Sequence, residues 1–249
     1  MQRTSTCQRF PNREVVIPLY FFQTNKFYRV SSSHSAKTRF AIAIDGPAAS
    51  GKSTLAREIA KQLGLVMVNS GAMYRAVTWK ALQENIDPSD HAAVIAMMDR
   101  IDIHCGENGM TSTCTIDGVD PGDELRSEAI NANVSAISAI PEVRDRLVQL
   151  QRNYLDHTSI IIEGRDIGSV VFPNTPFKIY IDADEKVRAA RRADVGEVDS
   201  VSKRDAADSE RTHAPLMIAD GAVVLDTSHH TIESGVAAAI EILKQQGLP

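Results

Sequence analysis

Residues 40–54 read FAIAIDGPAASGKST, and this stretch decides the fold. Its apolar first half is typical of a short buried β-strand. A glycine-containing segment follows, after which Leu55, Ile59 and Leu63 recur at helical spacing, with Gly64 placed to cap the helix. The order of strand, glycine loop and helix predicts a phosphate-binding loop in an α/β protein.

Residues 46–54, GPAASGKST, satisfy the pattern G-x-x-x-x-G-K-[ST]. Glycines let the backbone fold tightly, so that successive N–H groups point at phosphate oxygens, and the start of the helix adds positive potential. We expect Lys52 to contact the β- and γ-phosphates of ATP and the Ser53 hydroxyl to bind Mg²⁺. The expected ATP-binding residues are Gly46, Pro47, Ala48, Ala49, Ser50, Gly51, Lys52, Ser53 and Thr54.

Apolar runs and helical patterns alternate along the rest of the chain. The strand-type runs are LVMV at 65–68, SIIIEG at 159–164, FKIYIDA at 177–183 and GAVVLDTS at 221–228. They are continuously apolar instead of alternating with polar residues, which indicates a parallel sheet covered by helices on both faces. Residues 101–120 combine two short strands with Gly and Asn turn residues, so we predict a β-hairpin in an inserted subdomain.

Composition excludes several classes of protein. The 249 residues are 43% hydrophobic with a net charge of −5, which suits one well-filled core and gives no general attraction to nucleic acid or anionic membranes. Cys7, Cys105 and Cys114 show no CxxC spacing, which argues against a disulfide framework or a zinc site. Cys105 and Cys114 fall in the two hairpin strands, and we expect facing free thiols. No apolar stretch approaches the roughly 18 residues of a membrane span.

Residues 1–38 differ from the remainder, because they carry several Arg and Lys residues, clustered serines and a single acid, Glu14. Three interpretations stay open: an organellar transit peptide, a disordered extension, or upstream sequence read from an early start codon. We expect a disordered leader and a cytoplasmic protein, with an organellar location if the leader is a transit peptide.

Candidate acceptor residues follow the later strands. Arg75 lies in NSGAMYRAV, and Arg165 and Asp166 end the apolar run in SIIIEGRDIGSVVFP. Each could belong to a solvated surface or could bind substrate where the strands end. A basic run could likewise be a solvated face or an anion-binding lid. Its members are Arg188, Arg191, Arg192, Arg204 and Arg211.

Five segments in order, IAIDGPAASGKST, NSGAMYRA, EGRDIGSVVFP, KRDAADSERTHAPL and AVVLDTS, closely resemble bacterial-type cytidylate kinases of the nucleoside monophosphate kinase family. The resemblance covers residues 39–246. It implies a P-loop kinase fold with a core at 39–71 and 141–246, a monophosphate-binding insert at 72–140 and a short lid at 193–210. The activity it implies is Mg²⁺-dependent transfer of the ATP γ-phosphoryl group to CMP or dCMP, by a monomer.

The resemblance also implies roles for individual residues. Ser70, Arg75 and Arg165 would face the acceptor phosphate, whereas Ser135, Arg144 and Asp166 would read cytosine. Arg204 and Asp208 would bracket the acceptor sugar and phosphate, and Arg211 would bind a further anionic group. The residues expected to carry the transfer itself are Lys52, Arg165, Asp166, Arg192 and Arg204.

Two departures from the family pattern affect these expectations. The family often has Gly-Thr after the loop lysine, where this chain has Ser53 and Thr54. The stretch 192–204 is shorter than usual, so the lid is trimmed. Two alternatives stay open: a UMP/CMP kinase or another small-molecule P-loop kinase, and a catalytically weak nucleotide-binding protein, which the shortened lid favours.

Overall fold

The computed structural model describes residues 39–194, 206 and 215–248, which belong to one compact unit, Thr38–Pro249. The leader expected at residues 1–38 lies outside the described residues. So does most of the expected lid, together with Arg204, Asp208 and Arg211.

A seven-stranded sheet in the order β3-β4-β2-β5-β1-β6-β7 forms the centre of the fold. Neighbouring strands are parallel, except that β3 and β4 are antiparallel. The predicted class, a mainly parallel α/β sheet, is therefore confirmed. The strands are β1 (Ala41–Asp45), β2 (Val66–Asn69), β3 (Ile103–Asn108), β4 (Thr111–Ile116), β5 (Ile160–Gly164), β6 (Lys178–Asp182) and β7 (Val223–Asp226).

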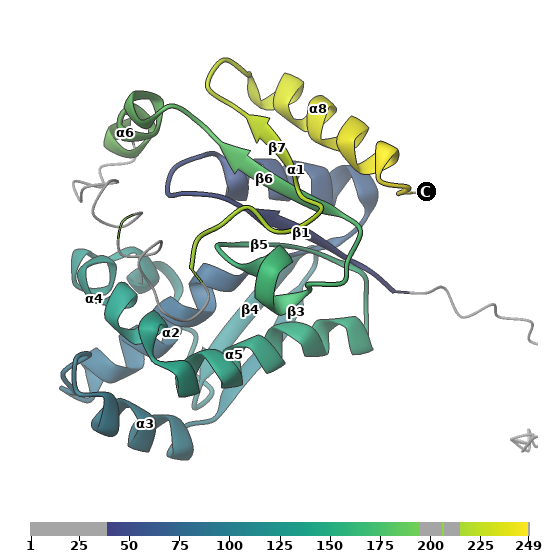
Figure 1. Cartoon of the computed structure of the whole chain (residues 1–249). Coiled ribbons are helices and arrows are strands. Elements are labelled where there is room, and N and C mark those ends of the chain that lie inside the picture. The colour runs from purple at the N-terminus through teal and green to yellow at the C-terminus, as the bar shows by residue number, and fades with distance from the viewer. Residues whose placement is uncertain (1–38, 195–205, 207–214, 249) are drawn as a thin grey trace, which may run out of the picture. The chain divides into compact units, whose positions relative to one another are not determined.

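Helices cover both faces of the sheet (Figure 1). They are α1 (Lys52–Leu63), α2 (Ser70–Gln83), α3 (His91–Arg100), α4 (Glu128–Ala139), α5 (Pro141–Asn153), α6 (Glu185–Asp194) and α8 (Ile232–Gln245). Short 3₁₀ turns lie at Gly122–Arg126 and Tyr154–Asp156, and a π-helical turn spans Ile167–Val171.

Successive residues of the central strands point into two different cores. In β1, Ile42 and Ile44 pack with α1 and α8, whereas Ala41 and Ala43 belong to the core under α5. A strand that is buried on both faces has no solvent-facing positions, so its sequence is continuously apolar. A third core joins α2, α3, α4 and α5 to one side of the β3–β4 hairpin.

The hairpin extends the central sheet instead of standing apart from it. Its strands join through Gly109 and Met110, and β4 continues the sheet by pairing with β2 at Met67 and Thr111. Met67 N–H also donates to Met110 O at 2.8 Å. The division into core and insert stays a prediction, because the described residues form one compact unit.

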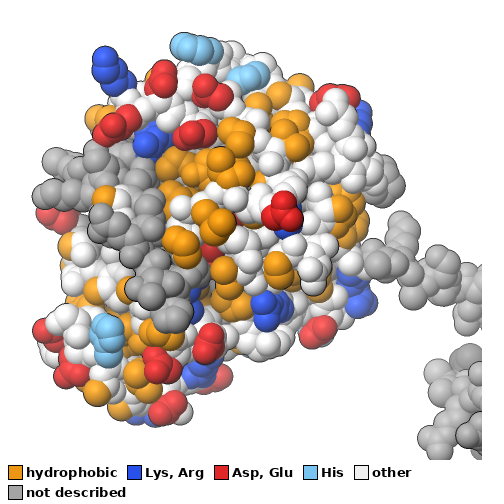
Figure 2. Space-filling view, in the orientation of Figure 1, with side chains coloured by type: hydrophobic (Ala, Val, Ile, Leu, Met, Phe, Trp, Pro, Cys, Tyr) orange, Lys and Arg blue, Asp and Glu red, His pale blue; other side chains and the backbone are white. Residues whose placement is uncertain are grey.

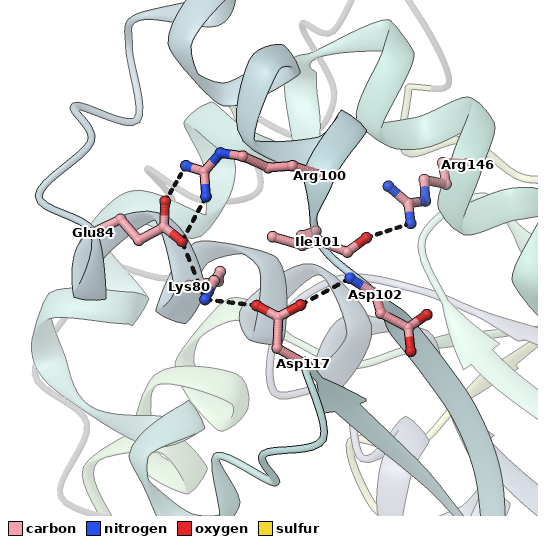
Figure 3. Close-up of polar contacts among 7 residues, drawn as sticks. All are labelled: Lys80, Glu84, Arg100, Ile101, Asp102, Asp117 and Arg146. Carbon is pink, nitrogen blue, oxygen red and sulfur yellow. Dashed lines mark hydrogen bonds and ion pairs between the residues drawn. The ribbon is translucent and has the colours of Figure 1, made fainter.

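Charged side chains close the base of this hairpin, and we call Lys80, Glu84, Arg100, Asp102 and Asp117 the hairpin-base cluster (Figure 3). Lys80 Nζ lies 3.1 Å from Glu84 and 2.7 Å from Asp117. Arg100 pairs with Glu84 as well, and this hydrogen bond lowers the pKa of the Glu84 carboxyl. Asp102 N–H donates to the Asp117 carboxylate at 2.9 Å. The cluster ties α2 and α3 to both strands at the base of the hairpin.

The π-helical turn after β5 is held by charged residues at both ends. Asp45, the last residue of β1 and 4% exposed, accepts the N–H groups of Ile167 and Gly168, each at 2.7 Å. At the other end, the Arg152 guanidinium donates to the carbonyls of Val170 and Val171. Negative charge at the free N–H end and positive charge at the free carbonyl end stabilise helical backbone.

The face shown in Figure 2 carries Lys and Arg side chains interspersed with Asp and Glu, and hydrophobic side chains lie between them. No continuous basic area appears among the coloured side chains of that face. In the described part of the chain, none of the helices has both the length and the apolar character needed to cross a bilayer.

Gly46 is a position where only glycine fits. It has φ +146°, and a Cβ there would lie 2.0 Å from the Ile181 carbonyl oxygen. We expect Gly46→Ala to lower the free energy of unfolding by roughly 3 kcal/mol or more, because backbone strain and a clash with backbone combine. Gly64→Ala is the matched control, with φ +66° and open space around it, and should cost about 1 kcal/mol. Urea unfolding measures the free energy of unfolding of both variants. Equal losses in the two variants would contradict a clash at Gly46.

Asp45 should make stability fall as the pH rises. Burial raises the pKa of Asp45 to about 6, although its two backbone hydrogen bonds act in the opposite direction. The folded state then holds this proton more tightly than the unfolded state does, so stability is lost between pH 3.8 and about 6. Relative to that of the Asp45→Asn variant, the free energy of unfolding of the wild type should fall by about 2 kcal/mol between pH 4.5 and 7.5. Urea unfolding of both proteins at both pH values tests this prediction. A difference in unfolding free energy between wild type and variant that stays the same at the two pH values would contradict it.

Candidate functional site

The loop between β1 and α1 has the geometry of a phosphate cradle. Ala49 and Gly51 adopt positive φ angles of 57° and 93°, which turn successive backbone N–H groups inward. Lys52 begins α1, is buried, and donates from Nζ to the Pro47 carbonyl at 2.7 Å. Its ammonium therefore lies over the loop at the positive end of a helix, where anions bind favourably.

Two arginines of α6 support this loop from outside. Arg188 donates to the Ala48 carbonyl at 3.1 Å, and Arg191 donates to the Ser50 carbonyl at 3.3 Å. Thr227, which follows β7, adds a hydroxyl hydrogen bond to the same Ser50 carbonyl at 2.8 Å. These contacts pair the carbonyls of Ala48 and Ser50, so they help to fix the backbone conformation of the loop.

Ser53 and Glu163 form an oxygen pair beside the loop. The Ser53 hydroxyl donates to a Glu163 carboxylate oxygen at 2.9 Å, and Glu163 lies at the end of β5 with 6% of its surface exposed. Hydroxyl and carboxylate oxygens are the ligands that hard divalent cations prefer. Among the described residues, no group of three or more His, Cys, Asp or Glu could hold a metal by itself. The Ser53 hydroxyl and the Glu163 carboxylate supply two oxygens of the kind that such a cation takes as ligands.

The first turns of α2 carry Ser70 and Arg75. Asn69 caps the helix by accepting Ala72 N–H at 3.0 Å, and the Ser70 hydroxyl donates to the Glu163 carbonyl at 2.8 Å. Arg75 is held by the Leu125 carbonyl at 2.9 Å. The Asn131 side chain accepts from the same guanidinium nitrogen at 2.7 Å. Both side chains therefore have fixed positions.

Arg144 and Asp166 form a buried ion pair in the wall of the cavity. Their side chains are 6% and 7% exposed, and Arg144 also donates to the Ser138 carbonyl at 3.0 Å. The guanidinium carbon lies 5.5 Å from the centre of the Tyr74 ring, within cation–π distance. Burying two charges is costly unless both are paired and hydrogen-bonded, and this pair meets that requirement.

Arg165 connects this wall to the phosphate loop. It follows β5, and its guanidinium donates to the Gly46 carbonyl at 2.6 Å. Arg192 of α6 is 7% exposed and also lines the cavity. Two further cationic side chains therefore line the cavity that contains the cradle and the Arg144–Asp166 pair.

One open cavity of about 640 Å³ brings these groups together. Of the sequence-predicted residues, its lining includes Ala48, Ala49, Lys52, Ser53, Thr54, Ser70, Arg75, Ser135, Arg144, Arg165, Asp166 and Arg192. A second cavity of about 530 Å³ adjoins the outer side of the loop and is lined by Gly51, Arg191, Thr227 and His230, among others. Gly46, Pro47 and Ser50 shape the loop without lining the larger cavity.

Sequence reasoning missed several residues that the structure brings to the site. Glu163 was visible as the acid that ends an apolar run just before Arg165, and this position was a usable signal. Asp45, Tyr74 and Thr227 gave no comparable signal. Their partners lie far away in sequence, as in the 122-residue separation of Asp45 and Ile167.

Comparison with known proteins agrees with this geometry. The model of the cytidylate kinase family matches residues 42–245. A protein of Streptomyces avermitilis named cytidylate kinase is 39% identical over 82% of this chain and 93% of its own length. Proteins of the same name from Caldanaerobacter subterraneus and Clostridium botulinum are each 38% identical over 82% of this chain, covering 94% and 97% of their own lengths. The chain belongs to the cytidylate kinase family.

Proposed function

We propose that the protein transfers the γ-phosphoryl group of ATP to CMP or dCMP, giving CDP or dCDP. One observation carries the proposal: a single cavity is lined by Lys52 and Ser53 at one side and by the buried Arg144–Asp166 pair at the other. A phosphate cradle and a polar, water-shielded wall in the same cavity suit a nucleotide donor and a base-bearing acceptor. The names of the relatives support the same activity.

ATP would bind with its phosphates in the loop Gly46–Thr54, where Lys52 faces the β- and γ-phosphates. The second cavity, beside Gly51, Arg191 and His230, is a suitable place for the rest of the nucleotide. Ser53 and Glu163 are proposed to hold Mg²⁺ together with the phosphates, because their oxygens fit a hard cation. When bound, the ion would neutralise charge on the transferring phosphoryl group.

The acceptor would bind between α2 and the end of β5. Cytosine carries an amine donor beside the acceptors N3 and O2, so a carboxylate and an arginine are its chemical complements. Asp166 is proposed to accept from the amine, with Arg144 and Ser135 serving the acceptor atoms. Ser70, Arg75 and Arg165 would hold the phosphate, and this part of the nucleotide is common to CMP and dCMP.

Catalysis in this arrangement is positioning and charge stabilisation. An acceptor phosphate oxygen attacks in line, so the protein needs no covalent nucleophile. Lys52, Arg165 and Arg192 surround the space between donor and acceptor, and they would stabilise the charge that spreads over the equatorial oxygens. Arg204, Asp208 and Arg211 remain predictions outside the described residues, as do the monomeric state and the cytoplasmic location.

Lys52→Ala should lower kcat for CDP formation by at least about 100-fold, because it removes a charge that faces the transferring group. Lys61→Ala is the matched control: it lies on the same helix, pairs only with Glu58 at the surface, and should change kcat by less than about twofold. A coupled assay with ATP and CMP gives both values, and thermal unfolding checks that each variant is folded. If Lys52→Ala kept its activity, the cradle assignment would be wrong.

Asp166→Asn should narrow the preference for CMP over UMP. Uracil offers a carbonyl where cytosine offers an amine, so a carboxylate there rejects UMP while an amide can donate to it. We expect the ratio of kcat/KM for CMP to that for UMP to fall by about tenfold or more, with little change in KM for ATP. The control is Asp145→Asn, an exposed carboxylate beside Arg144 in sequence. If the wild type turned over UMP as fast as CMP, the proposed role of Asp166 in recognising cytosine would be wrong.

A further inference from the structure

Cys105 and Cys114 are directly opposite each other in the β3–β4 ladder. Both are free thiols, each half-buried. They share a face of the hairpin with Ile103 and Ile116, the pair two positions along, and this face packs against the core. The two sulfur atoms therefore point the same way from adjacent strands.

Their position in the ladder is the one where opposite side chains come closest. Asp117 N–H donates to its directly opposite partner Asp102 at 2.8 Å, which identifies that pair as hydrogen-bonded. Hydrogen-bonded and non-hydrogen-bonded pairs alternate along an antiparallel ladder, so three positions further on the Cys105–Cys114 pair is non-hydrogen-bonded. Such pairs have Cα atoms about 4.5 Å apart, within the range of about 4.4–6.8 Å that disulfides span.

The two thiols are chemically unequal. A hydrogen bond from Cys114 lowers the pKa of the Cys105 thiol, and the same contact raises the pKa of Cys114. The thiolate is the nucleophile in thiol–disulfide exchange, so Cys105 is the sulfur that attacks first.

The backbone around the pair is fixed on several sides. The hairpin-base cluster closes one end, three residues from the cysteines (Figure 3). At the other end, Ser112 accepts Asn69 N–H at 3.2 Å, and Met110 accepts Met67 N–H. The Tyr154 hydroxyl donates to the Gly106 carbonyl at 2.9 Å, beside Cys105. Strands held in register in this way need little movement to join the sulfurs.

We propose that Cys105 and Cys114 are a dithiol modification site that low-molecular-weight disulfides convert reversibly to a cross-strand disulfide. The Cys105 thiolate attacks one sulfur of the small disulfide, forms a mixed disulfide and releases one thiolate. Cys114 then loses its proton to solvent and attacks the Cys105 sulfur, which releases the second thiolate. The protein gives up two electrons and two protons, and the small disulfide is reduced to two thiols.

The bond would act on stability more than on turnover. Neither cysteine lines the larger cavity, so the substrates do not meet the sulfurs. Joining two strands across a ten-residue segment restricts the unfolded chain. We expect the oxidised protein to have a Tm about 3–8 °C higher, with kcat and KM for CMP within about twofold.

Peptide mapping tests the proposal directly. The full chain is treated with oxidised glutathione, alkylated under denaturing conditions and digested with trypsin. Residues 101–126 contain no internal Lys or Arg, so one peptide carries both cysteines and lacks Cys7. We expect this peptide to be unalkylated and lighter by two hydrogens, and dithiothreitol to restore two alkylation sites. Recovery of two alkylated thiols, two mixed disulfides or a link between chains would overturn the proposal.

Three serine variants separate the steps. Cys114→Ser should accumulate a glutathione adduct on Cys105, and Cys105→Ser an adduct on Cys114, because neither variant has the second thiol that would displace glutathione. Both should lose the rise in Tm. Cys7→Ser is the matched control and should behave as the wild type does. Loss of glutathione from either single variant without added reductant, or a Tm rise that survives in either of them, would contradict the cross-strand disulfide.

Discussion

Two backbone N–H groups, those of Ile167 and Gly168, point at one buried carboxylate, and the arrangement of the site depends on this contact. Asp45 ends the strand that leads into the phosphate loop, and its partners directly follow Arg165 and Asp166. The contact therefore fixes the phosphate loop and the segment that carries Arg165 and Asp166 relative to each other. A Cβ at Gly168 would lie 3.2 Å from both Asp45 and the Lys178 side chain, a tight contact that would press on this carboxylate.

Charged residues of this protein form a buried ion pair at the cavity and a network of ion pairs at the base of the hairpin. The Arg144–Asp166 pair replaces apolar packing at a place where hydrophobic residues of similar size would often be at least as stable. In the proposed acceptor site, this pair would face the polar edge of a cytosine base. The hairpin-base cluster lies at the surface, where each ion pair is worth less than about 1 kcal/mol and only the network as a whole has a structural effect.

Much of the fold could be predicted from the sequence, because its strongest signals are local. The strand, loop and helix around Gly46–Thr54 and the continuously apolar strands depend on residue spacing alone. The pairing of β4 with β2 and the π-helical turn at Ile167–Val171 depend on partners elsewhere in the chain. For the same reason the motifs indicated Lys52, Arg144 and Asp166, whereas the supports supplied by Asp45, Arg191 and Thr227 appeared only in three dimensions.

The order of the strands has a consequence for how the acceptor could change. The phosphate loop follows β1, while the proposed acceptor residues follow β5 and β2, and β5 lies between these two strands. Hydrogen-bonded neighbours are about 4.8 Å apart, a spacing that no loop insertion alters. The sheet therefore holds the phosphate loop and the proposed acceptor residues at a constant distance from each other. A new acceptor specificity would have to arise from different side chains in the cavity wall.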